Sequence, residues 1–150
     1  MLEQQIEQDL KTALLAGDGL RVDTLRGLKS TLLNVKITTG KRDSGLTDDE
    51  ALPILAKEAK KRQESADMYT QGGDQTRADK ELAEKAIIEA YLPAQLSEAE
   101  ISAIVDEVIA TTGASDKSAM GATIGAVKAK AGSTADGALI ARLVKEKLGL

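Results

Sequence analysis

The sequence has no cysteine, histidine, phenylalanine or tryptophan, and it has only two tyrosines and two prolines in 150 residues. Without cysteine and histidine, the chain cannot form a disulfide framework, a zinc finger, a thiol nucleophile, a Ser-His or Cys-His triad, or a switch based on imidazole. The shortage of aromatic rings also excludes the base-stacking platforms of RRM-type domains. The sequence therefore excludes catalytic sites that depend on Cys or His, and RNA-binding sites that depend on aromatic stacking.

Long apolar runs are also missing, since no stretch approaches the roughly 18 apolar residues of a membrane span. The N-terminal segment, MLEQQIEQDL, is acidic and amphipathic, whereas a signal peptide needs a basic start and an apolar run. The sequence therefore predicts no membrane partner and a cytoplasmic protein, or an organellar one if a presequence has been removed. Hydrophobic residues make up 42% of the chain, which is enough for a core.

Apolar residues recur at helical spacing throughout the first 93 residues, and no sustained alternation predicts a strand. The first helix should end at Gly17 and the second near Thr38. Thr47 and Glu50 form a capping box that opens a third helix, which ends before Gly72. We expect its inward residues to be Leu52, Leu55, Ala59, Ala66 and Tyr69. A fourth helix is predicted from about Thr76 to Tyr91, with Leu82, Ala86, Ile87 and Tyr91 facing the core.

Pro53 conflicts with a regular third helix, because it lacks an N–H donor and would press on the carbonyl of Asp49. Either the first turn is distorted, or the helix begins near Pro53.

The last third of the chain predicts three shorter helices. Ser97 and Glu100 form a second capping box, and the helix that it opens should stop at Gly113. Two helices follow, over Ser118–Lys130 and from about Asp136 to Leu148. The fold class is thus all-α: a four-helix part with a long helical hairpin at 1–93, and a three-helix part at 94–150.

Charge is distributed unevenly, although the net charge is only −4. Residues 94–116 include five acidic residues and no basic one, whereas 117–150 include six basic residues and two acidic ones. A polyanion is therefore expected to meet the last two helices. The loop that ends in Asp136 and Gly137 is a capped connector on its residues alone, and its backbone donors offer a second interpretation as a phosphate contact.

The third helix holds the densest group of polar side chains, with Glu58, Arg62, Ser65 and Tyr69 on one face and Lys60 beside it. The simpler interpretation is a solvated face with ion pairs from Glu58 to Arg62 and from Lys60 to Glu64. Two other interpretations stay open. In the first, Arg62 binds an anionic ligand; in the second, Arg62 is partly buried and pairs across the helical hairpin with Glu84 or Glu89.

Arg21 and Arg26 of the second helix form a basic edge that is most simply explained as solvated. No Gly-Ser elbow, Ser-x-x-Lys motif, Walker pattern or Gly-x-Gly-x-x-Gly motif is present, so the sequence predicts no catalytic residues. The run Asp48-Asp49-Glu50 lacks the spaced ligands of a calcium loop and is better explained as helix-start charge. No metal and no cofactor are predicted.

Several short motifs occur in order along the chain: Arg21-x-x-x-Leu25-Arg26, Glu58-x-Lys60-x-Arg62-x-x-Ser65, Tyr91-Leu92-Pro93-x-Gln95-Leu96, Met120-Gly121 and Gly132-x-x-Ala135-Asp136-Gly137. Together these motifs resemble the YqeY family. The resemblance covers essentially the whole chain. It implies that the C-terminal part is similar to the tail domain of the B subunit of glutamine-dependent aspartyl/glutamyl-tRNA amidotransferase, which is understood to contact tRNA.

The resemblance leads to one main expectation and two alternatives. The main expectation is a non-catalytic module that binds tRNA or associates with the amidotransferase, through Lys128, Lys130, Gly132, Asp136, Gly137, Arg142 and Lys145. The first alternative is a carbon–nitrogen ligase that uses glutamine as amido donor, with Lys60, Arg62 and Ser65 as its polar cluster. The second is a helical adaptor for a protein partner.

Overall fold

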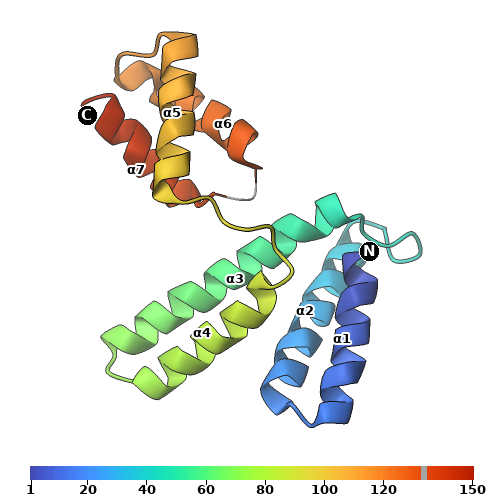
Figure 1. Cartoon of the computed structure of the whole chain (residues 1–150). Helices are drawn as coiled ribbons and strands as arrows, with labels where there is room; N and C mark the ends of the chain where they lie inside the picture. The colour runs from blue at the N-terminus through green and yellow to red at the C-terminus, as the bar shows by residue number, and fades with distance from the viewer. Residues whose placement is uncertain (133–134) are drawn as a thin grey trace. The chain divides into compact units, whose positions relative to one another are not determined.

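The computed structural model describes residues 1–132 and 135–150. Within these residues the protein is all-α, as predicted, with no strand (Figure 1). The chain divides into two compact units: Met1–Leu92, here called the N-terminal unit, and Pro93–Leu150, the C-terminal unit.

The N-terminal unit consists of two helical hairpins (Figure 1). The first pairs α1 (Leu2–Ala16) with α2 (Gly19–Thr38), and the second pairs α3 (Asp48–Gln71) with α4 (Gln75–Glu89). Gly17 ends α1 with φ +69°, in the left-handed region where glycine is favoured. The predicted capping box of α3 is present: the Glu50 amide donates to Thr47 Oγ1 over 3.2 Å, and the Thr47 amide donates to Glu50 Oε2 over 3.0 Å.

The structure decides the question of Pro53. Because α3 begins at Asp48 and continues past the proline, the alternative in which the helix begins near Pro53 is wrong. Pro53 is exposed, so its ring lies on the outer side of the helix. The capping box stabilises the first turn, where the proline removes one backbone hydrogen bond.

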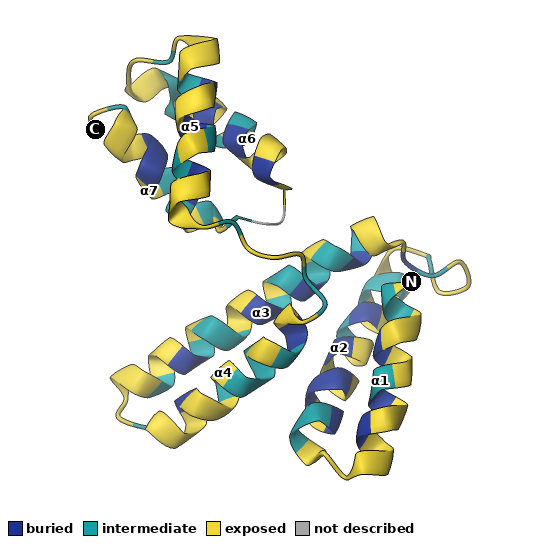
Figure 2. Cartoon of the chain, viewed as in Figure 1, coloured by how far each residue is buried: buried dark blue, intermediate teal, exposed yellow. Residues whose placement is uncertain are grey.

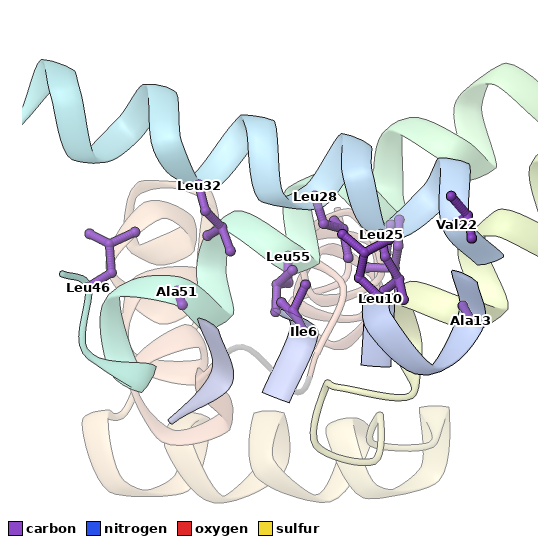
Figure 3. Packing of buried hydrophobic residues seen from close by; sticks show 12 residues of the cluster. Ile6, Leu10, Ala13, Val22, Leu25, Leu28, Leu32, Leu46, Ala51 and Leu55 are labelled. Carbon is purple, nitrogen blue, oxygen red and sulfur yellow. The ribbon is translucent and has the colours of Figure 1, made fainter. Parts of the chain in front are cut away.

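The core of the N-terminal unit lies where the two hairpins meet (Figure 3). Ile6, Leu25, Leu28 and Leu55 are among its buried members, and Ile88 is the residue that α4 contributes. The buried alanines Ala66 and Ala78, farther along the second hairpin, are not part of this cluster. The far half of the α3–α4 hairpin is therefore held by small residues and polar contacts between its own two helices.

The prediction for α4 was partly wrong. Leu82 and Ala86 are exposed rather than inward, the buried residues are Ala78 and Ile88, and the helix ends at Glu89. Figure 2 shows exposed positions along the whole length of α4. The face of α4 that meets α3 includes charged side chains that pair across the hairpin. Ile87 and Tyr91 do pack against the core, as predicted, so the apolar stripe identified only part of the inward face.

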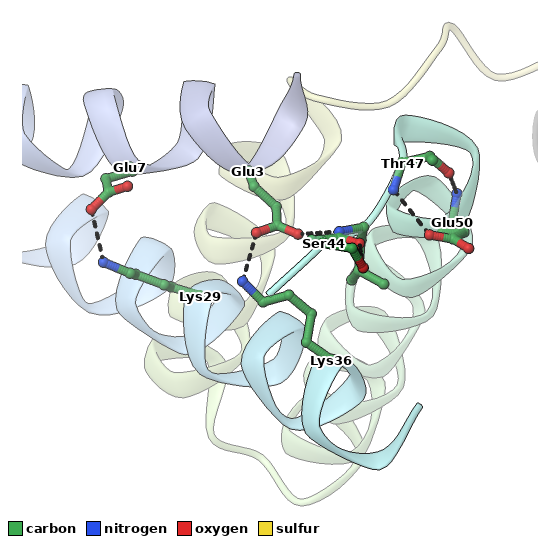
Figure 4. Close-up of polar contacts among 9 residues, drawn as sticks. Glu3, Glu7, Lys29, Lys36, Ser44, Thr47 and Glu50 are labelled. Carbon is green, nitrogen blue, oxygen red and sulfur yellow. Dashed lines mark hydrogen bonds and ion pairs between the residues drawn. The ribbon is translucent and has the colours of Figure 1, made fainter. Parts of the chain in front are cut away.

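A polar network ties the loop between α2 and α3 to α1 (Figure 4). Glu3 accepts hydrogen bonds from Lys36 Nζ over 2.7 Å and from the Leu46 amide over 2.9 Å. Burial raises the pKa of Glu3, but these two hydrogen bonds and the charge of Lys36 lower it by more. Lys29 pairs with Glu7 one turn farther along, over 3.2 Å.

The C-terminal unit contains α5 (Glu98–Thr112), a 3-10 turn η1 (Lys117–Ala119), α6 (Met120–Ala131) and α7 (Gly137–Lys147). Ser97 and Glu100 form the predicted capping box, and Gly113 ends α5 with φ +69°. Each pair of the three α-helices is in contact. They enclose a separate core, whose buried members among the described residues are Ile101, Val105, Val108, Val127, Ile140, Leu143 and Val144.

Candidate functional site

The acidic helix α5 neutralises half of the basic side chains of the C-terminal unit. Lys130 Nζ lies 2.6 Å from Glu107 Oε1, and Lys147 Nζ lies 2.7 Å from Asp106 Oδ1. Arg142 contacts Glu98 over 3.1 Å and Glu146, in its own helix, over 3.0 Å. The segregation of charge along the sequence is therefore largely cancelled in three dimensions, because acidic α5 packs against both basic helices.

The other carboxylates of this unit are occupied in caps. Glu100 accepts from the Ser97 amide, and Asp136 accepts from the Ala138 amide over 2.9 Å. Asp116 accepts from both the hydroxyl and the amide of Ser118, and these hydrogen bonds lower its pKa. All seven acidic side chains of the unit are thus engaged in a cap or an ion pair.

Three lysines of the C-terminal unit have no carboxylate partner among the described residues: Lys117, Lys128 and Lys145. All three are exposed. The unit has seven acidic and six basic residues, for a net charge of −1, and its three capping carboxylates accept hydrogen bonds but have no cation partner in the described structure. Two of them, Lys128 and Lys145, belong to the predicted set, and Lys117 was missed because it directly follows an acidic segment.

The predicted loop before α7 lies partly outside the described residues, which exclude 133 and 134. Gly132 has φ +61° and ψ −142°, a conformation that is essentially reserved for glycine. Asp136 is the N-cap of α7, as predicted. A Cβ on Gly137 would lie 3.4 Å from Cε of Lys128, so the Lys128 side chain extends across the first turn of α7.

The polar residues of α3 are organised by the hairpin. Arg62 Nη1 lies 3.1 Å from Glu81 Oε2 and 3.2 Å from Glu84 Oε2, so the interpretation of a partly buried arginine paired across the hairpin is confirmed for Glu84. Glu89 instead pairs with Lys85. Both ion pairs of the simpler interpretation are wrong: Glu58 pairs with Lys61 over 3.2 Å, and Lys60 and Glu64 form no ion pair with each other in the described structure.

Other members of this polar set have separate roles. The Arg77 guanidinium lies 5.9 Å from the ring centroid of Tyr69, a cation–π contact that closes the tip of the hairpin. Ser65 is half-buried, whereas Lys60 and Arg26 are exposed. In the described part of the chain, the polar contacts of Arg62 are with Glu81 and Glu84, and they do not include Arg26, Lys60 or Ser65.

A second polar cluster joins α1, α2 and the residues after α4. The Tyr91 hydroxyl donates to Asp9 Oδ2 and also interacts with Arg21. Burial and the Asp9 carboxylate raise the pKa of Tyr91, and the Arg21 guanidinium offsets part of the rise. Asp9 was missed by the sequence analysis. Asp9 lies at helical spacing in the inward row of Leu2, Ile6 and Ala13. A carboxylate in such an apolar row is the sequence signal that could have predicted a partly buried acid with a polar partner.

Among the described residues, no group of three or more acidic side chains is placed to hold a metal ion. In that same part of the chain, no helix is both long and apolar enough to cross a membrane.

These features define an all-α protein whose small C-terminal unit has a few uncompensated cations. A family model described as "Yqey-like protein" matches residues 3–148, so the chain belongs to the YqeY-like family.

Two curated fungal proteins are similar to part of the chain, and both are named "Altered inheritance of mitochondria protein 41, mitochondrial". The protein from Eremothecium gossypii is 35% identical over 89 residues, which cover 59% of this chain and 48% of that protein. The protein from Kluyveromyces lactis is 34% identical over 86 residues, which cover 57% and 45%. The match thus spans about half the length of each relative.

Proposed function

We propose that this protein is a non-catalytic module that binds the sugar–phosphate backbone of tRNA through its C-terminal unit, free or in association with a tRNA amidotransferase. The observation that carries the proposal is the charge pattern of that unit. Every carboxylate is engaged in a cap or an ion pair, whereas Lys117, Lys128 and Lys145 have no such partner in the described structure. The resemblance of this part to the amidotransferase tail supports tRNA as the polyanion.

Backbone binding suits a protein with so few aromatic residues. Phosphate contacts need only cations and amides, whereas reading unstacked bases needs rings to stack on. Three phosphate contacts predict weak binding that decreases with salt, since each contact releases condensed counterions. The proposal applies to the cytoplasm and equally to the mitochondrion, the compartment in the names of the fungal relatives, because tRNA is present in both.

The test is the binding of fluorescently labelled tRNA to the full chain at low salt. The variant K117Q/K128Q/K145Q should bind at least tenfold more weakly than the unaltered protein. The matched control is K11Q/K57Q/K80Q, which removes three exposed lysines of the N-terminal unit that have no carboxylate partner in the described structure. Equal losses in the two variants, or no binding by the unaltered protein, would refute the proposal.

A protein adaptor is the second candidate, and exposed apolar residues of the first hairpin favour it. Leu15 is 91% exposed and Ile37 is 53% exposed. A pocket of about 180 Å³ lies between α1 and α2, with Ile6, Leu32 and Leu33 among its lining residues. Capture of a protein partner from nuclease-treated extract, lost on replacing Leu15 and Ile37 by Ser, would favour this function over RNA binding.

The carbon–nitrogen ligase activity stays a prediction of the family resemblance. Of its predicted polar cluster, Arg62 is held by two glutamates of α4. Release of ammonia from glutamine by the purified chain, with charged tRNA and ATP, is the measurement that would support it.

A further inference from the structure

We infer that the carboxylates of α5 act as internal substitutes for RNA phosphates. They pair with half of the RNA-contacting cations and so limit the affinity for RNA. The inference deepens the proposed function and rests on it. It assigns Lys130, Arg142 and Lys147 to the RNA-binding surface and gives Glu107, Glu98 and Asp106 the role of competitors for them.

The three ion pairs share one arrangement. In each, a carboxylate of α5 contacts a cation of α6 or α7, at distances from 2.6 to 3.1 Å. A phosphate oxygen contacts an ammonium or guanidinium group over the same range. Each carboxylate therefore contacts its cation as a phosphate oxygen would.

These pairs are open to exchange. The side chains of Glu98, Asp106 and Glu107 are 58%, 63% and 62% exposed. Exposed ion pairs contribute little to folding stability, because water screens them and the two side chains lose freedom when they pair. The apolar core of the unit contains none of these charged side chains. A phosphate can therefore replace each carboxylate without unfolding the unit.

The consequence concerns both affinity and salt dependence. With α5 intact, RNA meets three uncompensated lysines and must displace carboxylates to reach the other three cations. With these three acids neutralised, Lys130 and Lys147 have no carboxylate partner, and Arg142 keeps only Glu146 of its own helix. The number of phosphate contacts then rises, and the dependence of log Kd on log salt becomes steeper by roughly 0.7–0.9 for each added contact.

The experiment compares E98Q/D106N/E107Q with D23N/D43N/E64Q, measuring affinity for labelled tRNA across a salt series. The second variant makes the same change in net charge at exposed acids of the N-terminal unit that have no ion-pair partner in the described structure. We expect the α5 variant to bind at least fivefold more tightly than this control, with a steeper salt dependence. Adding K130Q, R142Q and K147Q to the α5 variant should abolish the gain.

Two outcomes overturn the inference and are distinguishable from each other. If the unaltered protein binds tRNA and loses affinity in K117Q/K128Q/K145Q, but the α5 variant matches its control, the competition by α5 is refuted and the proposed function stands. If neither the unaltered protein nor the α5 variant binds tRNA at the lowest salt, both fail. Thermal unfolding of each variant verifies that it is folded, and the single variant E107Q provides the same comparison with the smallest perturbation.

Discussion

Replacing Arg62 by Gln should destabilise the protein by about 1–3 kcal/mol. The guanidinium makes two charged contacts across the α3–α4 hairpin, to Glu81 and Glu84. The side chains are largely buried, with 32% of Arg62, 17% of Glu81 and 15% of Glu84 exposed. A net contribution of roughly 1.5–3 kcal/mol is typical of hydrogen bonds to charged groups, and partial exposure reduces it. The variant also leaves two neighbouring carboxylates without their shared cation.

The assay is unfolding in denaturant, with K60Q as the control. Lys60 lies on the same helix, is exposed and has no carboxylate partner in the described structure, so its loss should change the free energy of unfolding by less than about 0.5 kcal/mol. A double-mutant cycle between R62Q and E84Q should give a clear coupling energy. If R62Q is as stable as K60Q, Arg62 does not hold the hairpin, and the interpretation of Arg62 as a ligand-gripping residue regains support.

Three further predictions concern single sites. Gly132→Ala should lower the free energy of unfolding by about 1–3 kcal/mol, because its positive φ strains any residue with a Cβ. Gly137→Ala should change it by less than about 1 kcal/mol, and thermal unfolding of the two variants measures the difference. Because the folded-state pKa of Glu3 is lowered, Glu3→Gln should lose stability at neutral pH, and its difference from the unaltered protein should shrink as the pH falls through that pKa. Because the folded-state pKa of Tyr91 is raised, the stability that its protonated hydroxyl provides should decline as the pH rises above about 10, and Tyr91→Phe should lack this alkaline decline.

Helix boundaries were the most predictable feature, because their signals are local. The capping boxes at Thr47 and Ser97 and the left-handed glycines at 17 and 113 each lie within a few residues of the helix end that they determine. The all-α class followed from spacing alone. At Pro53 the two local signals conflicted, and only the structure decided that the capping box at Thr47 outweighs the proline.

The inward face of α4 could not be predicted in the same way. Arg62 and Gln63 meet Glu81, Glu84 and Lys85 across the hairpin, and these contacts depend on the register between two helices. A search for apolar stripes selects Leu82 because it is hydrophobic, although the charged neighbours are the ones that face α3.

The candidate interface shows the same limit. The sequence places acidic and basic residues in separate segments, which predicts a basic surface at the end of the chain. Packing of α5 against α6 and α7 pairs three of the six cations with acids, which sequence order alone does not reveal. Lys117 is left uncompensated, although its neighbour Asp116 is acidic, because that carboxylate caps η1 instead.

The salt dependence of tRNA binding tests the central claim most directly. We predict that log Kd rises linearly with log salt for the unaltered protein, and that K117Q/K128Q/K145Q lowers this slope by roughly 2–3, at 0.7–0.9 for each lost phosphate contact. Parallel slopes for the two proteins would contradict the account, because the three uncompensated lysines would then make no contact with the RNA backbone.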